Sequence, residues 1–164
     1  MNDTIDLACL WSIPGIGAVR LRRLLEHFRG ARACLEAGPR ETAAVLNEPL
    51  QKYEPGWPDG AIRDQVIAFT ERPGRWICVR GEPEFPSQLE QVSELPIIFG
   101  FGEQPALSAE MLAVVGTRRV GRDGLRLTTE VSRWCIERGW GVVSGGAIGV
   151  DSEAHRTALS MAAT

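Results

Sequence analysis

Apolar residues in the first 72 positions recur at helical spacing. The spacing i, i+3, i+4, i+7 predicts one buried helix face made of Leu21, Leu24, Leu25 and Phe28. Gly30 is expected to end this helix, and Gly38 and Pro49 are expected to end two further short helices, ARACLEAG and RETAAVLNEP. A fourth helix is expected in AIRDQVIAFTERPG. Short helices with short connections predict a small orthogonal bundle.

Beyond Gly74 the pattern changes to short continuous apolar runs of strand length. These runs are RWICVRG, IIFGFG, LAVVG and WGVVS. The last two flank an amphipathic helix at 122–139, and its buried face is expected to hold Leu127, Val131, Trp134 and Cys135. Apolar strands that alternate with amphipathic helices predict a parallel sheet in an α/β fold.

The two patterns predict two domains, a small helical domain at 1–72 and an α/β domain at 73–164. A parallel sheet usually has about five or six strands and is covered on both faces. Only three or four strands are recognisable here. We therefore expect the α/β domain to be truncated, as the first part of a longer protein, with apolar faces uncovered or covered by another chain.

The composition limits the class of protein. A hydrophobic content of 44% and a charged content of 24% are typical of a soluble globular protein. No apolar run is long enough for a membrane span, and the acidic N-terminus is unlike a secretory signal. The scattered cysteines form no CxxC pair, which argues against a zinc or redox site and fits a reducing cytoplasm. We expect a cytoplasmic protein without a metal, cofactor or membrane partner.

Charge is segregated along the chain, although the net charge is only −3. Residues 17–32 hold five arginines and one glutamate, and residues 113–126 hold four arginines and one aspartate. Residues 82–110 hold six glutamates and no basic residue. Local fields of this kind steer a polyanion, but either arginine cluster alone is equally well explained as a solvated helix face.

A glycine-rich loop follows the last expected strand, in VVSGGAIGVDSEAH. Gly145 and Gly146 are expected to form a tight turn, with Asp151 as the N-cap of the next helix and Glu153 in its first turn. A strand, a glycine loop and a helix N-terminus are the usual geometry of a phosphate site. The spacing fits neither GxGxxG nor GK[ST], and a sharp turn without a ligand is the alternative.

A second loop, AVVGTRRVGRDG, also leads from a strand into a helix. It places Gly116, Thr117 and Arg118 at the carboxyl end of its strand, where open α/β sheets bind ligands. Loops from neighbouring strands would share one hollow, to which one loop contributes arginines and the other backbone donors. This combination predicts a pocket for a phosphodiester or a phosphorylated nucleotide.

These motifs resemble the DNA processing protein A family (DprA, also called Smf) over nearly the whole chain. VVSGGAIGVDSEAHRTAL is similar to the family signature S-G-x-A-x-G-I-D-x-x-A-H-x-x-A-L, and AVVGTRRVGRDG is similar to its G-[ST]-R loop. FPSQLEQVSELPIIFGFGE resembles the segment that precedes them, and WSIPGIGAVRLRRLLEHFRG resembles the N-terminal helical domain. Phe85 and Val150 depart from the family pattern, and Ile148 stands where the family often has a basic residue.

The resemblance implies a SAM-like or helix-hairpin-helix-like domain followed by the first part of an extended Rossmann-like fold. It implies a protein without catalytic residues that binds single-stranded DNA in natural transformation, protects incoming strands and helps to load the RecA recombinase. It also implies a homodimer formed through the Rossmann-like domain. Carried over by motif, the residues expected to line the DNA backbone pocket are Gly116, Thr117, Arg118, Arg119, Ser144, Gly145, Gly146, Ala147 and Gly149.

Three alternatives stay open at this point. The IPGIG turn, with Gly15, Gly17 and Arg20, would serve equally well as a helix-hairpin-helix contact with DNA or as a packing turn in a protein-interaction domain. If the turn belongs to a protein-interaction domain, the protein would be an adaptor that works through its helices. Rossmann-like nucleoside 5′-monophosphate phosphoribohydrolases also use a glycine loop, but their P-G-G-x-G-T-x-x-E motif does not occur in these 164 residues.

Overall fold

The computed structural model describes residues 2–92 and 94–162 of the chain. They form two compact units, Met1–Leu107 and Ser108–Thr164. This division falls later than the expected domain boundary at 72/73, because the first two strands pack with the helices. Each unit is described by itself below.

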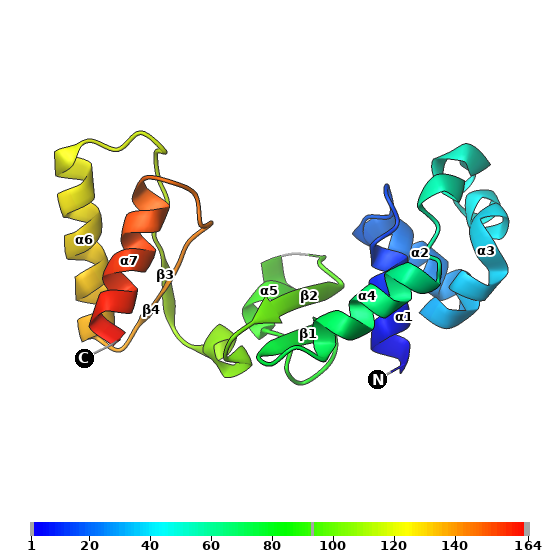
Figure 1. The fold of residues 1–164 in the computed structure, drawn as a ribbon, viewed down its shortest axis with the longest axis horizontal. Coiled ribbons are helices and arrows are strands. Elements are labelled where there is room, and N and C mark those ends of the chain that lie inside the picture. The colour runs from blue at the N-terminus through cyan, green and yellow to red at the C-terminus, as the bar shows by residue number, and fades with distance from the viewer. Residues whose placement is uncertain (1, 93, 163–164) are drawn as a thin grey trace. The chain divides into compact units, whose positions relative to one another are not determined.

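The part of the first unit before β1 (Arg75–Val79) consists of four helices and two 3-10 turns. The helices are α1 (Asn2–Trp11), α2 (Ala18–Phe28), α3 (Ala31–Leu46) and α4 (Gly60–Thr70), and the turns are Leu50–Lys52 and Glu54–Gly56. Helices α1 to α4 lie around a common core (Figure 1). Its fully buried side chains include Leu10, Ile13, Leu21, Leu24 and Tyr53. The predicted face of α2 is confirmed, since Leu25 and Phe28 also pack against this core.

The helix ends predicted at Gly30 and Gly38 are confirmed, and the helix predicted to end near Pro49 ends at Leu46, before the left-handed Asn47. Helix α2 stops at Phe28 because Arg29 adopts the left-handed conformation (φ 61°), and Gly30 follows at φ 154°. Within α3, Gly38 leaves the helical conformation (φ 88°) and Pro39 follows it, so the helix is kinked into two segments. The expected helix in AIRDQVIAFTERPG is α4, which Asp59 caps by accepting a hydrogen bond from the Ile62 amide.

Strands β1 (Arg75–Val79) and β2 (Ile97–Phe101) form an antiparallel pair, with Arg75 opposite Phe101. The expectation that these two runs join a parallel sheet is therefore wrong. In the described part of their connection the one helix is the short α5 (Ser87–Val92), and an antiparallel return needs no helical crossover over the sheet. Ile97 belongs to the helical core and β1 packs against it, which explains why the pair lies in the first unit.

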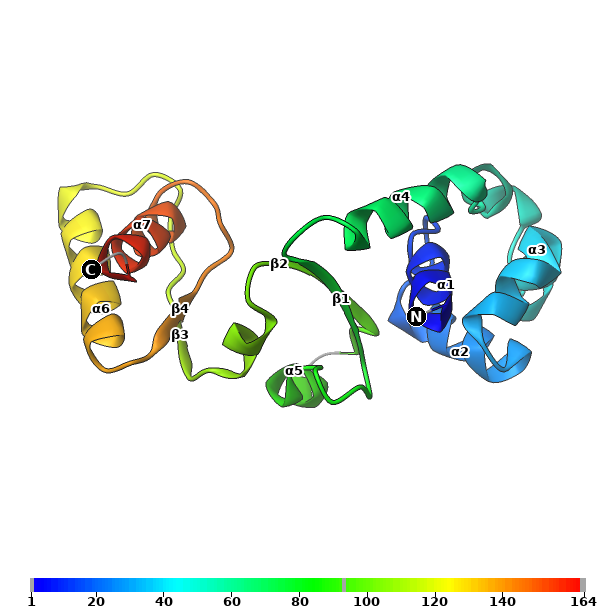
Figure 2. The same cartoon turned by 60° about the horizontal axis from the view of Figure 1, so that its bottom comes forward.

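The second unit has the order strand, helix, strand, helix. Its elements are β3 (Met111–Ala113), α6 (Arg122–Glu137), β4 (Gly141–Val143) and α7 (Val150–Ala162), and a 3-10 turn, Gln104–Ser108, precedes them. The strands β3 and β4 pair in parallel, as the sequence predicts. Helices α6 and α7 lie side by side next to this pair (Figures 1 and 2). No described helix is long and apolar enough to cross a membrane.

The buried face of α6 differs from the expected one. Cys135 is buried as expected, but Leu127 is 61% exposed and Trp134 is 43% exposed. Thr128 and Ser132 are buried instead, because small side chains allow α6 to pack closely on α7. The exposed Trp134 ring is contacted by Trp140 at a centroid distance of 5.7 Å and by the Arg138 guanidinium at 4.1 Å.

Candidate functional site

Two loops leave the carboxyl ends of the parallel strands, residues 114–121 after β3 and residues 144–149 after β4. The structure brings them together, as expected for neighbouring strands. The Val114 amide donates to the Val143 carbonyl at 3.0 Å, which continues the strand pairing into the loops. The Ser144 hydroxyl donates to the Val114 carbonyl at 2.7 Å. The two loops therefore start as a single hydrogen-bonded edge.

Glycines allow the two loops to touch. Gly149 adopts φ 92°, and a Cβ atom placed there would lie 2.3 Å from the Thr117 carbonyl oxygen. A Cβ on Gly116 would lie 2.8 Å from the Val150 Cγ2 atom. The Val150 amide also donates to the Thr117 carbonyl at 3.2 Å. These glycines are required for the close approach of one loop to the other, whether or not a ligand is bound.

Asp151 lies beneath both loops. Its Oδ1 atom accepts from the Gly116 amide at 3.4 Å, and its Oδ2 atom accepts from the Ala147 amide at 3.4 Å. Helix α7 begins at Val150, so Asp151 is in its first turn, and the expected N-cap position is wrong. The side chain turns toward the loops, where it accepts hydrogen bonds from the Gly116 and Ala147 amides.

The charge on Asp151 is stabilised by these donors. Burial raises the pKa of Asp151, but the Ala147 and Gly116 amides, the Ser144 hydroxyl and the Gly145 amide outweigh burial, so the pKa lies below its ordinary value. Asp151 is therefore an internal anion at neutral pH. Sequence reasoning identified the residue and missed its partners, because Gly116 lies 35 positions away in the chain.

The outer surface of the loops carries the predicted arginines. Thr117, Arg118 and Arg119 are exposed, and the Thr117 hydroxyl oxygen accepts from the Arg119 amide at 3.1 Å. Neither Arg118 nor Arg119 forms an ion pair with any residue of the described ranges. Exposed guanidinium groups without an internal acid are available to bind a phosphate oxygen bidentately.

Glu153 joins the two helices behind the loops. This buried carboxylate accepts from the Thr129 hydroxyl on α6 at 2.6 Å and from the Arg156 guanidinium on its own helix. The hydrogen bond from Thr129 contributes most to holding the pKa of Glu153 below its ordinary value, and the hydrogen bond from Arg156 contributes next. The sequence places Glu153 correctly in the first turn of α7 but gives no sign of its partner on α6.

In the first unit, the expected contact residues of the IPGIG turn are held by an ionic cluster. Gly15 adopts φ 85°, and its carbonyl accepts from Arg20 Nη1 at 3.0 Å. Arg20 Nη2 donates to Glu48 Oε1 at 2.6 Å. Gly17 is the N-cap residue of α2. A contact of Arg20 with DNA stays a prediction.

Lysine and tyrosine complete that cluster. Glu48 Oε2 accepts from Lys52 Nζ at 2.6 Å and from the Tyr53 hydroxyl. Lys52, Tyr53 and Arg20, in this order, lower the pKa of Glu48 to about 2. Burial and the neighbouring Glu48 raise the pKa of Tyr53 to about 12. The cluster connects the start of α2 with the end of α3, so its evident role is structural.

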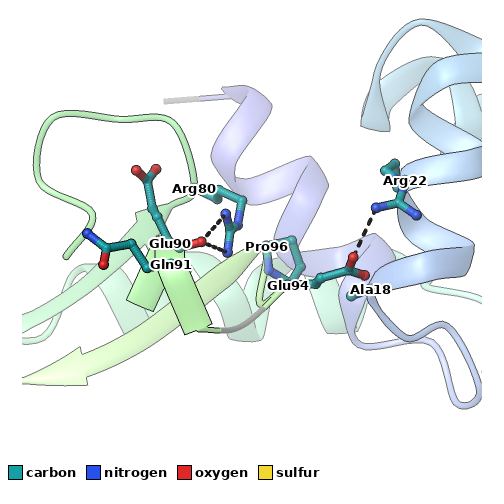
Figure 3. Close-up of a pocket in the computed structure, with 7 residues that line it drawn as sticks. All are labelled: Ala18, Arg22, Arg80, Glu90, Gln91, Glu94 and Pro96. Carbon is teal, nitrogen blue, oxygen red and sulfur yellow. Dashed lines mark hydrogen bonds and ion pairs between the residues drawn. The ribbon is translucent and has the colours of Figure 1, made fainter. Parts of the chain in front are cut away.

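The first unit also contains a cavity of about 560 Å³ (Figure 3). Arg22 lines it and pairs with Glu94 at 3.3 Å, and Arg80 donates to the Glu90 carbonyl at 3.3 Å. The acidic and basic side chains balance each other, so the cavity offers no excess of positive charge to an anion. Within the described residues, no three His, Cys, Asp or Glu side chains are grouped so that they could hold a metal ion.

Comparison with known proteins identifies the family. The sequence model of the DNA recombination-mediator protein A family matches residues 76–164, which include both loops. The chain belongs to this family. Its members include the DNA processing proteins called DprA and Smf, and the expected resemblance is confirmed. The match begins close to the expected boundary at 73, although the compact units divide later.

Curated relatives show the same likeness. Protein Smf from Synechocystis is 26% identical over 158 residues, which are 91% of this chain and 39% of that protein. Protein Smf from Borreliella burgdorferi is 32% identical over 100 residues, 60% of this chain and 31% of that protein. DNA processing protein DprA from Bacillus subtilis is 24% identical over 119 residues, 71% of this chain and 38% of that protein. The chain thus spans less than half the length of these relatives.

A solved structure shares the fold. The X-ray structure of DNA processing protein A from Streptococcus pneumoniae matches with a TM-score of 0.69 and 20% sequence identity. The match covers 96% of this chain and 54% of the other. The mixed α/β fold of this chain is therefore that of the DNA processing proteins. Their family is one of proteins that act on DNA in recombination.

Proposed function

We propose that this protein binds single-stranded DNA through the phosphate backbone, at the two loops after β3 and β4. The observation that carries the proposal is that the exposed arginine loop at Thr117–Arg119 is joined directly to the second glycine loop. Both loops lie at the carboxyl ends of parallel strands, where α/β proteins bind ligands. Membership of a family of DNA recombination mediators supports DNA as the ligand.

The chemistry of the loops favours phosphate over bases. Arginine forks bind phosphate oxygens and carry no information on base sequence. The binding we propose is therefore independent of sequence, and no catalytic residue, metal or cofactor takes part. In this account the protein acts in the cytoplasm as a homodimer, formed through a Rossmann-like domain. It protects incoming strands in natural transformation and hands them to the RecA recombinase.

A gel shift with the full-length protein tests the proposal. A single strand should be shifted at lower protein concentration than a duplex of the same sequence. The double variant Arg118→Ala/Arg119→Ala should lose this shift. Arg133→Ala is the matched control, because Arg133 is an exposed arginine of α6 outside the loops. Equal loss in the control, or binding unchanged in the double variant, would refute the loops as the DNA site.

The same preparation separates binding from catalysis. Incubation with nucleoside 5′-monophosphates should release no free base, whereas a phosphoribohydrolase would release it. An adaptor that works through the helices would give neither a shifted strand nor a free base. Each of the three functions considered from the sequence therefore has a distinct outcome.

A further inference from the structure

The Asp151 carboxylate occupies the inner side of both glycine loops. The residue Asp151 is 6% exposed, and its two carboxylate oxygen atoms accept from amides on different loops, Gly116 on one and Ala147 on the other. A Cβ on Gly145 would lie 3.1 Å from Asp151 Oδ2, so the carboxylate packs directly against the second loop. The space beneath the loops thus already contains an anion that belongs to the protein.

This arrangement changes which groups can reach a ligand. The amides of Gly116 and Ala147 point to Asp151, and a second anion beside the carboxylate would be repelled. The side chains of Thr117, Arg118 and Arg119 on the first loop are exposed and form no hydrogen bond to Asp151 in the described residues. The backbone cradle expected from the sequence is therefore filled, at least at these two amides.

We propose that Asp151 is a positioning residue that fastens the two loops together, and that the Thr117–Arg119 side chains then provide the phosphate contacts. The phosphate contacts of Thr117–Arg119 rest on the proposed function, whereas the fastening of the loops by Asp151 does not. The two amide hydrogen bonds to Asp151 support this role. The Val150 amide bonded to the Thr117 carbonyl and the close approach of Gly149 to that carbonyl show that the loops are in contact where Asp151 lies.

Asparagine is the informative replacement. Asp151→Asn keeps the volume of the side chain but removes its charge and replaces one acceptor oxygen by an NH₂ donor. That donor would face an amide N–H, either from Gly116 or from Ala147, so one loop would lose its partner. Asp123→Asn is the matched control, because Asp123 is an exposed acid in the first turn of α6 that accepts no hydrogen bond from a described residue of either loop.

Hydrogen–deuterium exchange on the full-length protein measures the fastening directly. In Asp151→Asn, peptides covering 114–121 and 144–149 should exchange on the order of tenfold faster than in the wild type, with peptides from α1 to α4 unchanged. The Asp123→Asn protein should exchange like the wild type. Unchanged exchange in both loops of Asp151→Asn would overturn the proposal, and so would faster exchange in only one loop.

A second variant covers the case in which Asp151→Asn fails to fold. Ser144→Ala removes the hydroxyl that bonds the Val114 carbonyl and helps to stabilise the Asp151 charge. It should accelerate exchange in both loops by a smaller factor, and no change would count against the fastening. Binding of a labelled single strand is measured in parallel. If the wild type binds no strand but loop exchange is faster in the variants, the proposed function is refuted and the fastening is supported.

Discussion

At the scale of single residues, Arg118 is the side chain on which the proposed binding depends most. It follows Thr117 at the point where the first loop contacts Gly149 of the second. Arg119 lies further along the loop, and Arg122 is the first residue of α6. None of these three arginines forms an ion pair within the described part of the chain, so each is available to a ligand. Position therefore distinguishes them, and Arg118 lies closest to the joined loops.

Removal of this guanidinium should weaken binding without unfolding the protein. A charge-assisted hydrogen bond contributes about 1.5–3 kcal/mol, so Arg118→Ala should bind a single strand roughly ten- to a hundredfold more weakly. Arg118→Lys should recover part of the loss, because lysine keeps the charge but not the fork. Fluorescence anisotropy measures binding and thermal melting measures folding. A normal affinity of Arg118→Ala together with a loss in Arg119→Ala or Arg122→Ala would mean that the site is misassigned.

The cluster around Glu48 predicts a specific dependence of stability on pH. The folded protein holds the pKa of Glu48 at about 2, below its ordinary value of 4.5, so its contribution is present above pH 4.5 and is lost as the pH falls toward 2. The pKa of Tyr53 is raised from 10.0 to about 12, so its contribution is present below pH 10 and is lost as the pH rises toward 12.

Thermal melts at a series of pH values check this expectation. Glu48→Gln should lower the melting temperature at neutral pH and flatten the loss of stability between pH 4.5 and 2. Glu36→Gln is the control, because Glu36 makes a single exposed ion pair with Arg32 at 2.9 Å. If Glu48→Gln and Glu36→Gln melt alike across this range, the cluster does not stabilise the fold.

At the scale of elements, the glycines of the second loop have different tasks. Gly146 and Gly149 both adopt a positive φ, 75° and 92°. Apart from its chain neighbours, no described residue has an atom within 4 Å of a Cβ built on Gly146, whereas a Cβ on Gly149 would overlap the Thr117 carbonyl. The first glycine therefore makes the turn possible, and the second allows α7 to start against the other loop.

Alanine at the two positions separates these tasks. Gly146→Ala should cost about 1 kcal/mol, because only the backbone conformation is strained. Gly149→Ala should cost about 2 kcal/mol more, because the loops must also move apart. Chemical denaturation of both variants gives the difference. Equal free energies of unfolding would show that the loops are not in contact at Gly149.

At the scale of the whole molecule, local signals were readable from the sequence and long-range contacts were not. The helix ends at Gly30 and Gly38 follow from the conformations that glycine allows, and both were predicted. The apolar pattern placed Trp134 on the buried face of α6, but close packing against α7 selects small residues instead. The hydrogen bond from the Gly116 amide to Asp151 could not be predicted from the sequence, because it depends on the pairing of β3 with β4.

The sheet of the second unit leaves apolar side chains exposed, which predicts association of the 164-residue chain. Val143 is 47% exposed on β4, and Val115 is 68% exposed just after β3. Exposed apolar patches favour contacts between molecules. Sedimentation should show association that depends on concentration. Val143→Thr should reduce it. Val19→Thr is the control and should leave it unchanged, because it makes the same substitution at an exposed valine of α2. A monomer at every concentration would contradict this prediction.

The salt dependence of single-strand binding by the full-length protein tests the central claim most directly. Bound phosphates release counterions, so the logarithm of the binding constant should fall linearly with the logarithm of salt concentration, by about 0.7 per phosphate contact. Two unrelated sequences should give the same line, and Arg118→Ala should reduce the slope by about 0.7. Binding that is insensitive to salt, a preference of more than about a decade for one sequence, or an unchanged slope in Arg118→Ala would contradict phosphate binding at these loops.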